Sequence, residues 1–182
     1  MNFIMHLAKE TFLRKRSYLN KLLVLFVFIL PFRCMSQKNF DKKINALLSH
    51  SVPLVHENEL NDNFQNGEFM LLDTRSVEEY EISHLEGAHF IDYDGFNSEM
   101  VKDINKDQPI VLYCSVGYRS EKIGEKLQEL GYTKVYNLYG GIFDWKNKDN
   151  QVINSQNLPT DSVHTYNRNW SQWLEKGIKV YD

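Results

Sequence analysis

The chain has 182 residues, a length with room for one ordinary domain. Its composition, 42% hydrophobic and 25% charged, is typical of a soluble globular protein with a single core. The formal net charge of −3 argues against a nucleic-acid partner, because affinity for nucleic acid comes largely from cations that meet phosphates. We therefore expect one compact domain and no binding to nucleic acid.

The first 36 residues depart from this average composition. Five basic residues precede an apolar run over residues 22–32, and they are Lys9, Arg14, Lys15, Arg16 and Lys21. This order is typical of a secretory signal peptide, and small groups at Cys34 and Ser36 favour cleavage before Gln37. The run is shorter than the roughly 20 apolar residues that span a bilayer. We expect residues 1–36 to direct export to the periplasm or secretion, with an uncleaved membrane anchor as the alternative.

Cleavage before Gln37 changes the charge and the cysteine content. It removes six of the 21 basic residues and one of the 24 acidic residues, so the mature net charge is −8. A lipid anchor on Cys34 is disfavoured by the bulky Phe32 and Arg33 before it. The mature chain then keeps one thiol, Cys114, whereas exported domains of this size normally pair their cysteines. This unpaired thiol indicates a chemical role for Cys114.

Short apolar runs alternate with segments of helical spacing along the next hundred residues. Strands are expected at the runs 52–55, 69–72, 88–91, 110–113 and 135–138. Helices are expected over 40–48, 60–64, 76–83, a stretch that ends at Leu130 before Gly131, and a stretch after Gly140-Gly141. Asn66-Gly67 is a turn signal. Apolar strands that alternate with helices predict a three-layer α/β fold, with a mostly parallel sheet covered by helices on both faces.

The composition changes beyond Trp145. Residues 146–156 are rich in Asn, Lys, Gln and Ser and predict a loop. Four apolar residues then recur at helical spacing before Gly177, and they are Tyr166, Trp170, Trp173 and Leu174. We expect this helix to pack on the main domain, because exposed tryptophans are costly. The chain thus divides into a signal peptide (1–36), a domain (37–145) and a C-terminal extension (146–182).

One loop combines a thiol, a glycine and a cation between a strand and a helix. It contains Cys114, Ser115, Val116, Gly117, Tyr118, Arg119 and Ser120. Ligands bind beyond the carboxyl ends of parallel strands, where the first N–H groups of a helix carry partial positive charge and favour a thiolate. Gly117 lets the backbone form an anion-binding nest, and Arg119 can hold an anionic substrate. The loop predicts a cradle for a negative sulfur species, with Ser120 as a helix cap.

This loop resembles the active loop of the rhodanese family, and two further segments resemble the other motifs of that family. They are Asp73-Thr74-Arg75 with Glu79-Tyr80 and His84-Leu85-Glu86-Gly87-Ala88, and Gly140-Gly141-Ile142-Phe143-Asp144-Trp145. The three motifs occur in the family's order across residues 54–145. The resemblance implies a doubly wound sheet and a sulfurtransferase that needs no cofactor. Cys114 would take a sulfane sulfur from thiosulfate, a persulfide or a polysulfide and pass it to a thiol or cyanide, while the N–H groups of residues 115–120 bind the sulfur species.

The second motif supplies supporting residues rather than catalysts. We expect Asp73, Arg75, Glu79 and His84 to hold the loops beside the active site, since Arg75 can pair with a carboxylate and Asp73 can accept backbone hydrogen bonds. No metal site is expected, because the histidines lack ligand spacing and the single mature cysteine is already assigned. The expected donor is a small sulfur-containing anion, and a membrane is a partner only where the N-terminal segment stays uncleaved.

Two other functional classes share this fold. Phosphatases and arsenate reductases resemble this loop but place five residues between cysteine and arginine, whereas four separate Cys114 from Arg119 here. A non-catalytic binding module is the other alternative, although such modules often lack the cysteine. Relatives often carry an arginine directly after the cysteine, and Ser115 removes that charge. Thiosulfate, a dianion, is therefore expected to be a weaker donor than a persulfide or polysulfide.

The N-terminal pattern generates the first testable prediction. Expression in a bacterium with two membranes should yield a periplasmic protein that begins at or near Gln37, because the basic, apolar and small-residue regions follow the order that signal peptidase requires. N-terminal sequencing of the periplasmic fraction measures this directly. Intact residues 1–36 in the membrane fraction would establish the anchor instead.

Overall fold

A computed structural model describes residues 37, 39–63 and 69–181 of the chain. The expected signal peptide lies outside the described residues, and so do Phe64 and the Asn66-Gly67 turn. The chain divides into two compact units, Met1–Lys42 and Lys43–Asp182, and the second unit carries the sheet. Residues 39–47 are helical, close to the opening helix that the sequence predicts. Among the described residues, no helix has the length and apolar character needed to cross a membrane.

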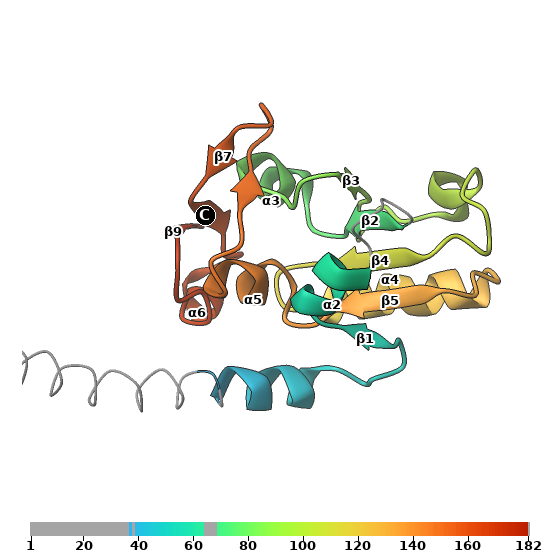
Figure 1. The fold of residues 1–182 in the computed structure, drawn as a ribbon, viewed down its shortest axis with the longest axis horizontal. Coiled ribbons are helices and arrows are strands. Elements are labelled where there is room, and N and C mark those ends of the chain that lie inside the picture. The colour runs from blue at the N-terminus through green and yellow to red at the C-terminus, as the bar shows by residue number, and fades with distance from the viewer. Residues whose placement is uncertain (1–36, 38, 64–68, 182) are drawn as a thin grey trace, which may run out of the picture. The chain divides into compact units, whose positions relative to one another are not determined.

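The central sheet has five strands, and every pairing within it is parallel. The strands are β1 (Leu54–Val55), β2 (Met70–Asp73), β3 (Ala88–Phe90), β4 (Ile110–Tyr113) and β5 (Val135–Leu138). Their order is β1-β5-β4-β2-β3, which Figure 1 shows from bottom to top. The chain therefore builds outward in one direction from β2 to β3 and in the other from β4 to β5. The predicted doubly wound α/β fold is confirmed, and the order reverses between β2 and β4, where such folds bind ligands.

Three α-helices connect these strands, and a fourth follows β5. They are α2 (Glu57–Asn63), α3 (Val77–Ile82), α4 (Tyr118–Glu129) and α5 (Gly141–Asn147), and a 3-10 helix covers Ser98–Val101. Helix α3 begins with a capping box, in which the Ser76 hydroxyl accepts the N–H of Glu79 and the Glu79 carboxylate accepts the N–H of Ser76. Helix α4 ends before Gly131, which has a φ of 87°. Local capping signals thus set the start of α3 and the end of α4.

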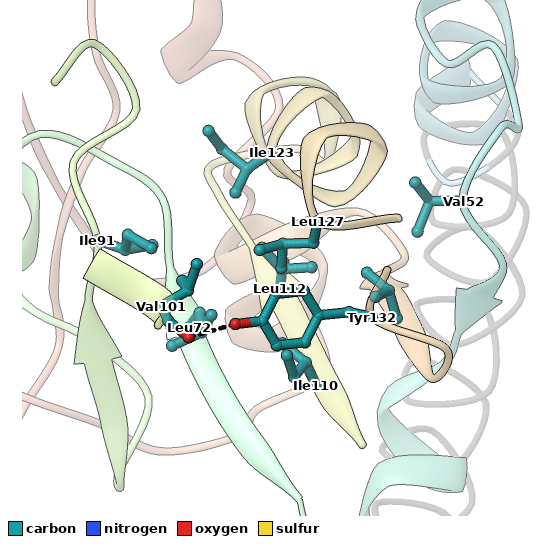
Figure 2. Packing of buried hydrophobic residues seen from close by; sticks show 10 residues of the cluster. Val52, Leu72, Ile91, Val101, Ile110, Leu112, Ile123, Leu127 and Tyr132 are labelled. Carbon is teal, nitrogen blue, oxygen red and sulfur yellow. Dashed lines mark hydrogen bonds between the residues drawn. The ribbon is translucent and has the colours of Figure 1, made fainter. Parts of the chain in front are cut away.

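An apolar cluster fills the space between the sheet and α4. Ile123 and Leu127 of α4 lie over Leu72, Ile110 and Leu112 of the two central strands (Figure 2). All five side chains are at most 3% exposed, so this layer excludes water. The alternate residues of the same strands are also buried, and they include Leu71, Val111 and Tyr113. Burial on both faces explains why these strands are continuously apolar.

The C-terminal extension differs from the single helix that its periodicity predicts. It contains two small sheets, formed by β6 (Val152–Ile153) with β7 (Pro159–Thr160) and by β8 (Ser162–His164) with β9 (Ile178–Val180), and one helical turn, α6 (Arg168–Ser171). The predicted helix is wrong because Tyr166 has a left-handed φ of 64°, and the extended Asn167 caps α6 just after it. The predicted loop 146–156 is also incomplete, since α5 runs into it and β6 lies within it.

The extension is bonded to the domain at the carboxyl end of the strands (Figure 1). The backbones of Ile153 and His84 exchange two hydrogen bonds of 2.8 and 2.9 Å. The Asn147 amide donates to the carbonyl of Trp173 at 3.0 Å. Leu174 is fully buried, whereas Tyr166 is 55% exposed. Of the predicted apolar stripe, Leu174 is therefore buried and Tyr166 is not, and Val163 of β8 is a second buried side chain of the extension.

This anchoring generates a stability prediction. Leu174→Ala should lower the free energy of unfolding by about 2–5 kcal/mol, because it removes a fully buried side chain and leaves a cavity. Leu158→Ala is the matched control from the same extension, since Leu158 is 55% exposed, and it should change stability by less than about 0.5 kcal/mol. Denaturant unfolding of both variants measures the difference. Equal stability would show that the extension does not pack through Leu174.

Candidate active site

Cys114 directly follows β4, at the carboxyl end of the central strands, where the strand order reverses. Its side chain is 1% exposed, and the backbone N–H of Gly117 points at Sγ with an N to Sγ distance of 3.1 Å. Gly117 is the N-cap of α4 and has a φ of 109°, which favours glycine. The first N–H groups of a helix have no partner within the helix. The thiol therefore lies at a helix end that favours negative charge.

The third sequence motif, residues 140–145, binds the backbone of this loop. The N–H groups of Ile142 and Phe143 donate to the carbonyls of Cys114 at 2.9 Å and of Ser115 at 3.2 Å. A Cβ on Gly141 would lie 2.2 Å from the Cys114 oxygen, so only glycine fits there. The N-terminus of α5 thus binds the carbonyls of the loop. This contact explains why a paired glycine precedes α5.

The carboxylate of Glu79 binds the loop from the side. Arg119 donates through Nη1 to Oε2 at 2.7 Å and through Nη2 to Oε1 at 2.8 Å, which makes the pair bidentate. The Ser115 hydroxyl donates to Oε1 at 3.0 Å and accepts a bond from Arg119 Nη2 at 3.1 Å. The Glu79 side chain is 2% exposed and that of Arg119 is 20% exposed. The cation that the sequence assigned to an anionic substrate is therefore balanced by a carboxylate of the protein.

Both partners of this pair are ionised at neutral pH. Burial raises the pKa of Glu79, but the hydrogen bonds and the charge of Arg119 outweigh it and bring the Glu79 pKa down to about 2. Burial likewise disfavours the Arg119 cation, while Glu79 and Cys114 raise the Arg119 pKa above its ordinary value. The serine and glutamate spacing of the capping box is visible in the sequence and places Glu79 at the start of a helix. It does not reveal Arg119 as the partner.

Ser120 does not cap α4, contrary to the sequence prediction. Its hydroxyl is fully buried within the first turn and donates to Asn137 Oδ1 at 2.7 Å. The Asn137 amide in turn donates to the carbonyl of Gly117 at 2.9 Å. The actual N-cap, Gly117, has no side chain with which to cap. Sequence reasoning missed Asn137, although a polar residue inside the apolar run of β5 was a signal that could have identified it.

The supporting motif lies at the end of β2, next to the end of β4. Arg75 is fully buried, donates to both carboxylate oxygens of Asp73, and reaches the carbonyl of Ser83 at 2.5 Å. His84 stacks on Tyr80 with 3.9 Å between ring centroids, and its Nδ1 lies 3.0 Å from the Tyr80 carbonyl oxygen. These contacts hold the segment between β2 and β3 in place. His84 is not among the described residues that line the cavity at Cys114.

A cavity of about 300 Å³ opens above Cys114. Five residues of the predicted loop line it, and they are Cys114, Ser115, Val116, Tyr118 and Arg119. Gly117 and Ser120 are not among the described lining residues. Sequence reasoning missed the other four, which are Tyr93, Asp94, Tyr166 and Trp170. Within the described part of the chain, no cluster of histidine, cysteine and acidic side chains could hold a metal ion.

The ion pair generates a prediction about pH. Because the folded pKa of Glu79 lies below its ordinary value of 4.5, its stabilising contribution is complete above pH 4.5 and is lost as the pH falls toward 2. This loss is on the order of 3 kcal/mol. Glu79→Gln should flatten the dependence of unfolding free energy on pH in that window, whereas Glu81→Gln, an exposed change on the same helix, should not. Denaturant unfolding from pH 6 to pH 2 measures the slopes, and identical slopes for all three proteins would contradict this assignment.

Curated relatives and solved structures match the central part of the chain. A "tRNA uridine(34) hydroxylase" of Photorhabdus laumondii is 34% identical over 111 residues, which cover 58% of this chain and 30% of that protein. A protein of the same name from Escherichia coli is 33% identical over 95 residues, covering 50% of this chain and 27% of its own length. The matched region thus spans less than a third of these relatives.

Solved structures show the same fold. A Bacillus halodurans protein matches with a TM-score of 0.53 and 24% identity, covering 57% of this chain and 78% of that one. A rhodanese-related protein from Thermoplasma volcanium matches with a TM-score of 0.50 and 22% identity, covering 56% and 97%. The sequence model of the family described as "Rhodanese-like domain" matches residues 56–148, which include all three motifs. With this match over half of its length, the chain belongs to the rhodanese-like domain family.

Proposed function

We propose that this protein is a sulfurtransferase that carries a sulfane sulfur as a persulfide on Cys114. The observation that carries the proposal is the position of the thiol, in the lining of a cavity and with Sγ 3.1 Å from the Gly117 nitrogen at the start of α4. The N–H groups at this helix end can stabilise negative charge on sulfur both in the Cys114 thiolate and in the Cys114 persulfide. No other described cysteine competes for the role.

The transfer divides into two displacements at sulfur. In the first, the Cys114 thiolate attacks the outer sulfur of the donor and forms a new S–S bond. The S–S bond within the donor breaks, and its electron pair leaves with the remainder, which is sulfite when the donor is thiosulfate. In the second, an acceptor thiolate or cyanide attacks the outer sulfur of the persulfide, and the electron pair of the broken bond returns to Cys114. Such covalent exchange predicts ping-pong kinetics.

The Glu79–Arg119 pair supports a donor other than thiosulfate. The guanidinium is bound through two nitrogens to a buried carboxylate, so its charge is largely balanced within the wall of the site. Ser115 adds no cation. The persulfide or polysulfide anion of an organic thiol carries one negative charge, whereas thiosulfate carries two, and it is therefore the better donor for this loop. Arg119 positions Ser115 and Glu79 rather than acting as an independent anion receptor.

Two further features bear on the proposal. The tRNA reaction in the names of the curated relatives is not carried over to this chain, because the match covers at most 30% of the length of either relative. The formal net charge of −3 also disfavours binding to the phosphates of a nucleic acid. The N-terminal pattern supports a place of action outside the cytoplasm, in the periplasm or after secretion.

The chemistry is tested by mass. Incubation of the purified protein with a polysulfide should add about 32 mass units, the mass of one sulfur, and later addition of cyanide should remove it as thiocyanate. Peptide mapping should place the added sulfur on Cys114. Thiosulfate should load the same residue more slowly.

Two variants complete this test. Cys114→Ser should abolish loading, because a hydroxyl lacks the sulfur chemistry. Arg119→Ala keeps the thiol but leaves Glu79 unpaired in the wall, so it should slow loading by about tenfold or more. An unmodified Cys114 that still titrates as a free thiol would refute the sulfurtransferase, and an aryl phosphate assay would then separate a phosphatase from a binding module.

A further inference from the structure

Four aromatic residues line the cavity at Cys114, and only two of them lie in the region that matches the family. Tyr93 and Tyr118 lie within residues 56–148, whereas Tyr166 and Trp170 belong to the C-terminal extension beyond it. Tyr118 is 41% exposed and Tyr166 is 55% exposed, so their rings are available to a ligand. Val116, which also lines the cavity, adds another apolar side chain. The extension therefore changes the surface that a substrate meets on its way to the thiol.

The two aromatic residues of the extension are held in place by specific contacts. The N–H of Tyr166 donates to His164 Nδ1 at 3.2 Å, and its ring centroid lies 5.9 Å from the guanidinium carbon of Arg119. Asn167 accepts the N–H of Trp170 at 3.1 Å, and the Lys43 ammonium lies 5.4 Å from the Trp170 ring centroid. The hydrogen bonds fix the backbone at both residues, and each ring lies beside a cation of the protein in the lining of the cavity.

The charges of the lining oppose an anionic ligand body. Asp94 and Arg119 are the charged members of the described lining. The Arg119 cation is already paired with the buried Glu79, so Asp94 contributes the remaining negative charge of the wall. The N–H groups at the start of α4 still favour a negative sulfur close to Cys114. The site thus favours a ligand whose sulfur is anionic and whose body is not.

The cavity is larger than the smallest acceptors need. Its volume of about 300 Å³ is at the lower end of the range found for small organic ligands, and cyanide or sulfide would fill only a minor part of it. Aromatic rings bind apolar and aromatic bodies through area burial and ring stacking. Volume, lining and charge therefore indicate one class of ligand.

We propose that the acceptor is an organic thiol with an uncharged apolar or aromatic body, which lies against Tyr166 and Trp170 while its sulfur meets Cys114. This inference rests on the proposed sulfurtransferase function. The acceptor thiol first loses its proton to water, and its thiolate attacks the outer sulfur of the Cys114 persulfide. The new S–S bond forms on the acceptor, the bond to Cys114 breaks, and its electron pair restores the Cys114 thiolate. The acceptor leaves as an organic persulfide.

The test compares acceptors of matched length on protein that already carries sulfur. The persulfide is formed with polysulfide, excess donor is removed, and loading is confirmed by mass before any acceptor is added. Sulfur removal is then followed with 2-phenylethanethiol and with 2-mercaptoethanesulfonate, which share a two-carbon linker and differ in the body. The second-order rate constant should be at least about tenfold larger for the aromatic thiol.

Variants assign this preference to the extension. Tyr166→Ala and Trp170→Ala should each lower the ratio of the two rate constants by about fivefold or more, because each removes one aromatic wall. Tyr166→Phe should keep the ratio, since it retains the ring. Asp94→Asn should raise the rate constant for the sulfonate. Leu158→Ala is the matched control, because Leu158 is exposed in the same extension and lies outside the described lining.

The outcomes are distinguishable. Equal rate constants for the two thiols in the unmodified protein would overturn the proposal, and so would an unchanged ratio in both alanine variants of the aromatic residues. A Leu158→Ala variant that shifted the ratio as strongly would also overturn it, because the effect would not then belong to the cavity wall. Failure of polysulfide to load Cys114 would instead refute the sulfurtransferase itself, and the mass measurement before acceptor addition reports this separately.

Discussion

The buried carboxylate of Glu79 is the contact on which the geometry of the site depends. One oxygen accepts the N–H of Ser76 and closes the capping box of α3, and the same carboxylate binds Arg119 through two nitrogens and Ser115 through its hydroxyl. A helix start and the loop that holds Cys114 are thereby joined at one group. Removal of the carboxylate would leave a largely buried guanidinium without its counter-charge, which is far more costly than the loss of an exposed ion pair.

The topology of the sheet explains why these groups meet. Strands β2 and β4 are adjacent, but the chain leaves them in opposite directions across the sheet. The segments after their carboxyl ends therefore face each other, and the Thr74 N–H at the end of β2 donates to the Tyr113 carbonyl at 2.9 Å. The close approach of Gly141 to the Cys114 carbonyl adds a third support. Glu79, the end of β2 and the start of α5 thus hold the loop, so its N–H groups are fixed before a ligand binds.

The extension is part of the site as well as part of the fold. Leu174 and Val163 are fully buried and secure it to the domain, so its aromatic residues are presented from an anchored segment. Tyr166 adopts a left-handed backbone conformation, which is unfavourable for a tyrosine and persists only where the surrounding structure requires it. This turn lies between the end of β8 and Asn167, the N-cap residue of α6. A segment beyond the family-matched region thereby contributes to the entrance of the cavity.

The sequence by itself determined the fold class, the approximate places of the five strands of the central sheet and the position of the thiol directly after one of them. The runs 110–113 and 135–138 correspond residue for residue to β4 and β5, because continuous apolar strands are a local signal. The tertiary structure alone decided that Arg119 pairs with Glu79, 40 residues earlier in the chain, and that Tyr166 and Trp170 line the cavity. Residue spacing along one segment carries no information about which distant segment lies opposite it. Residue spacing also could not show the left-handed turn at Tyr166, because the same helical spacing of apolar residues occurs here in a segment that folds into short strands and a single helical turn.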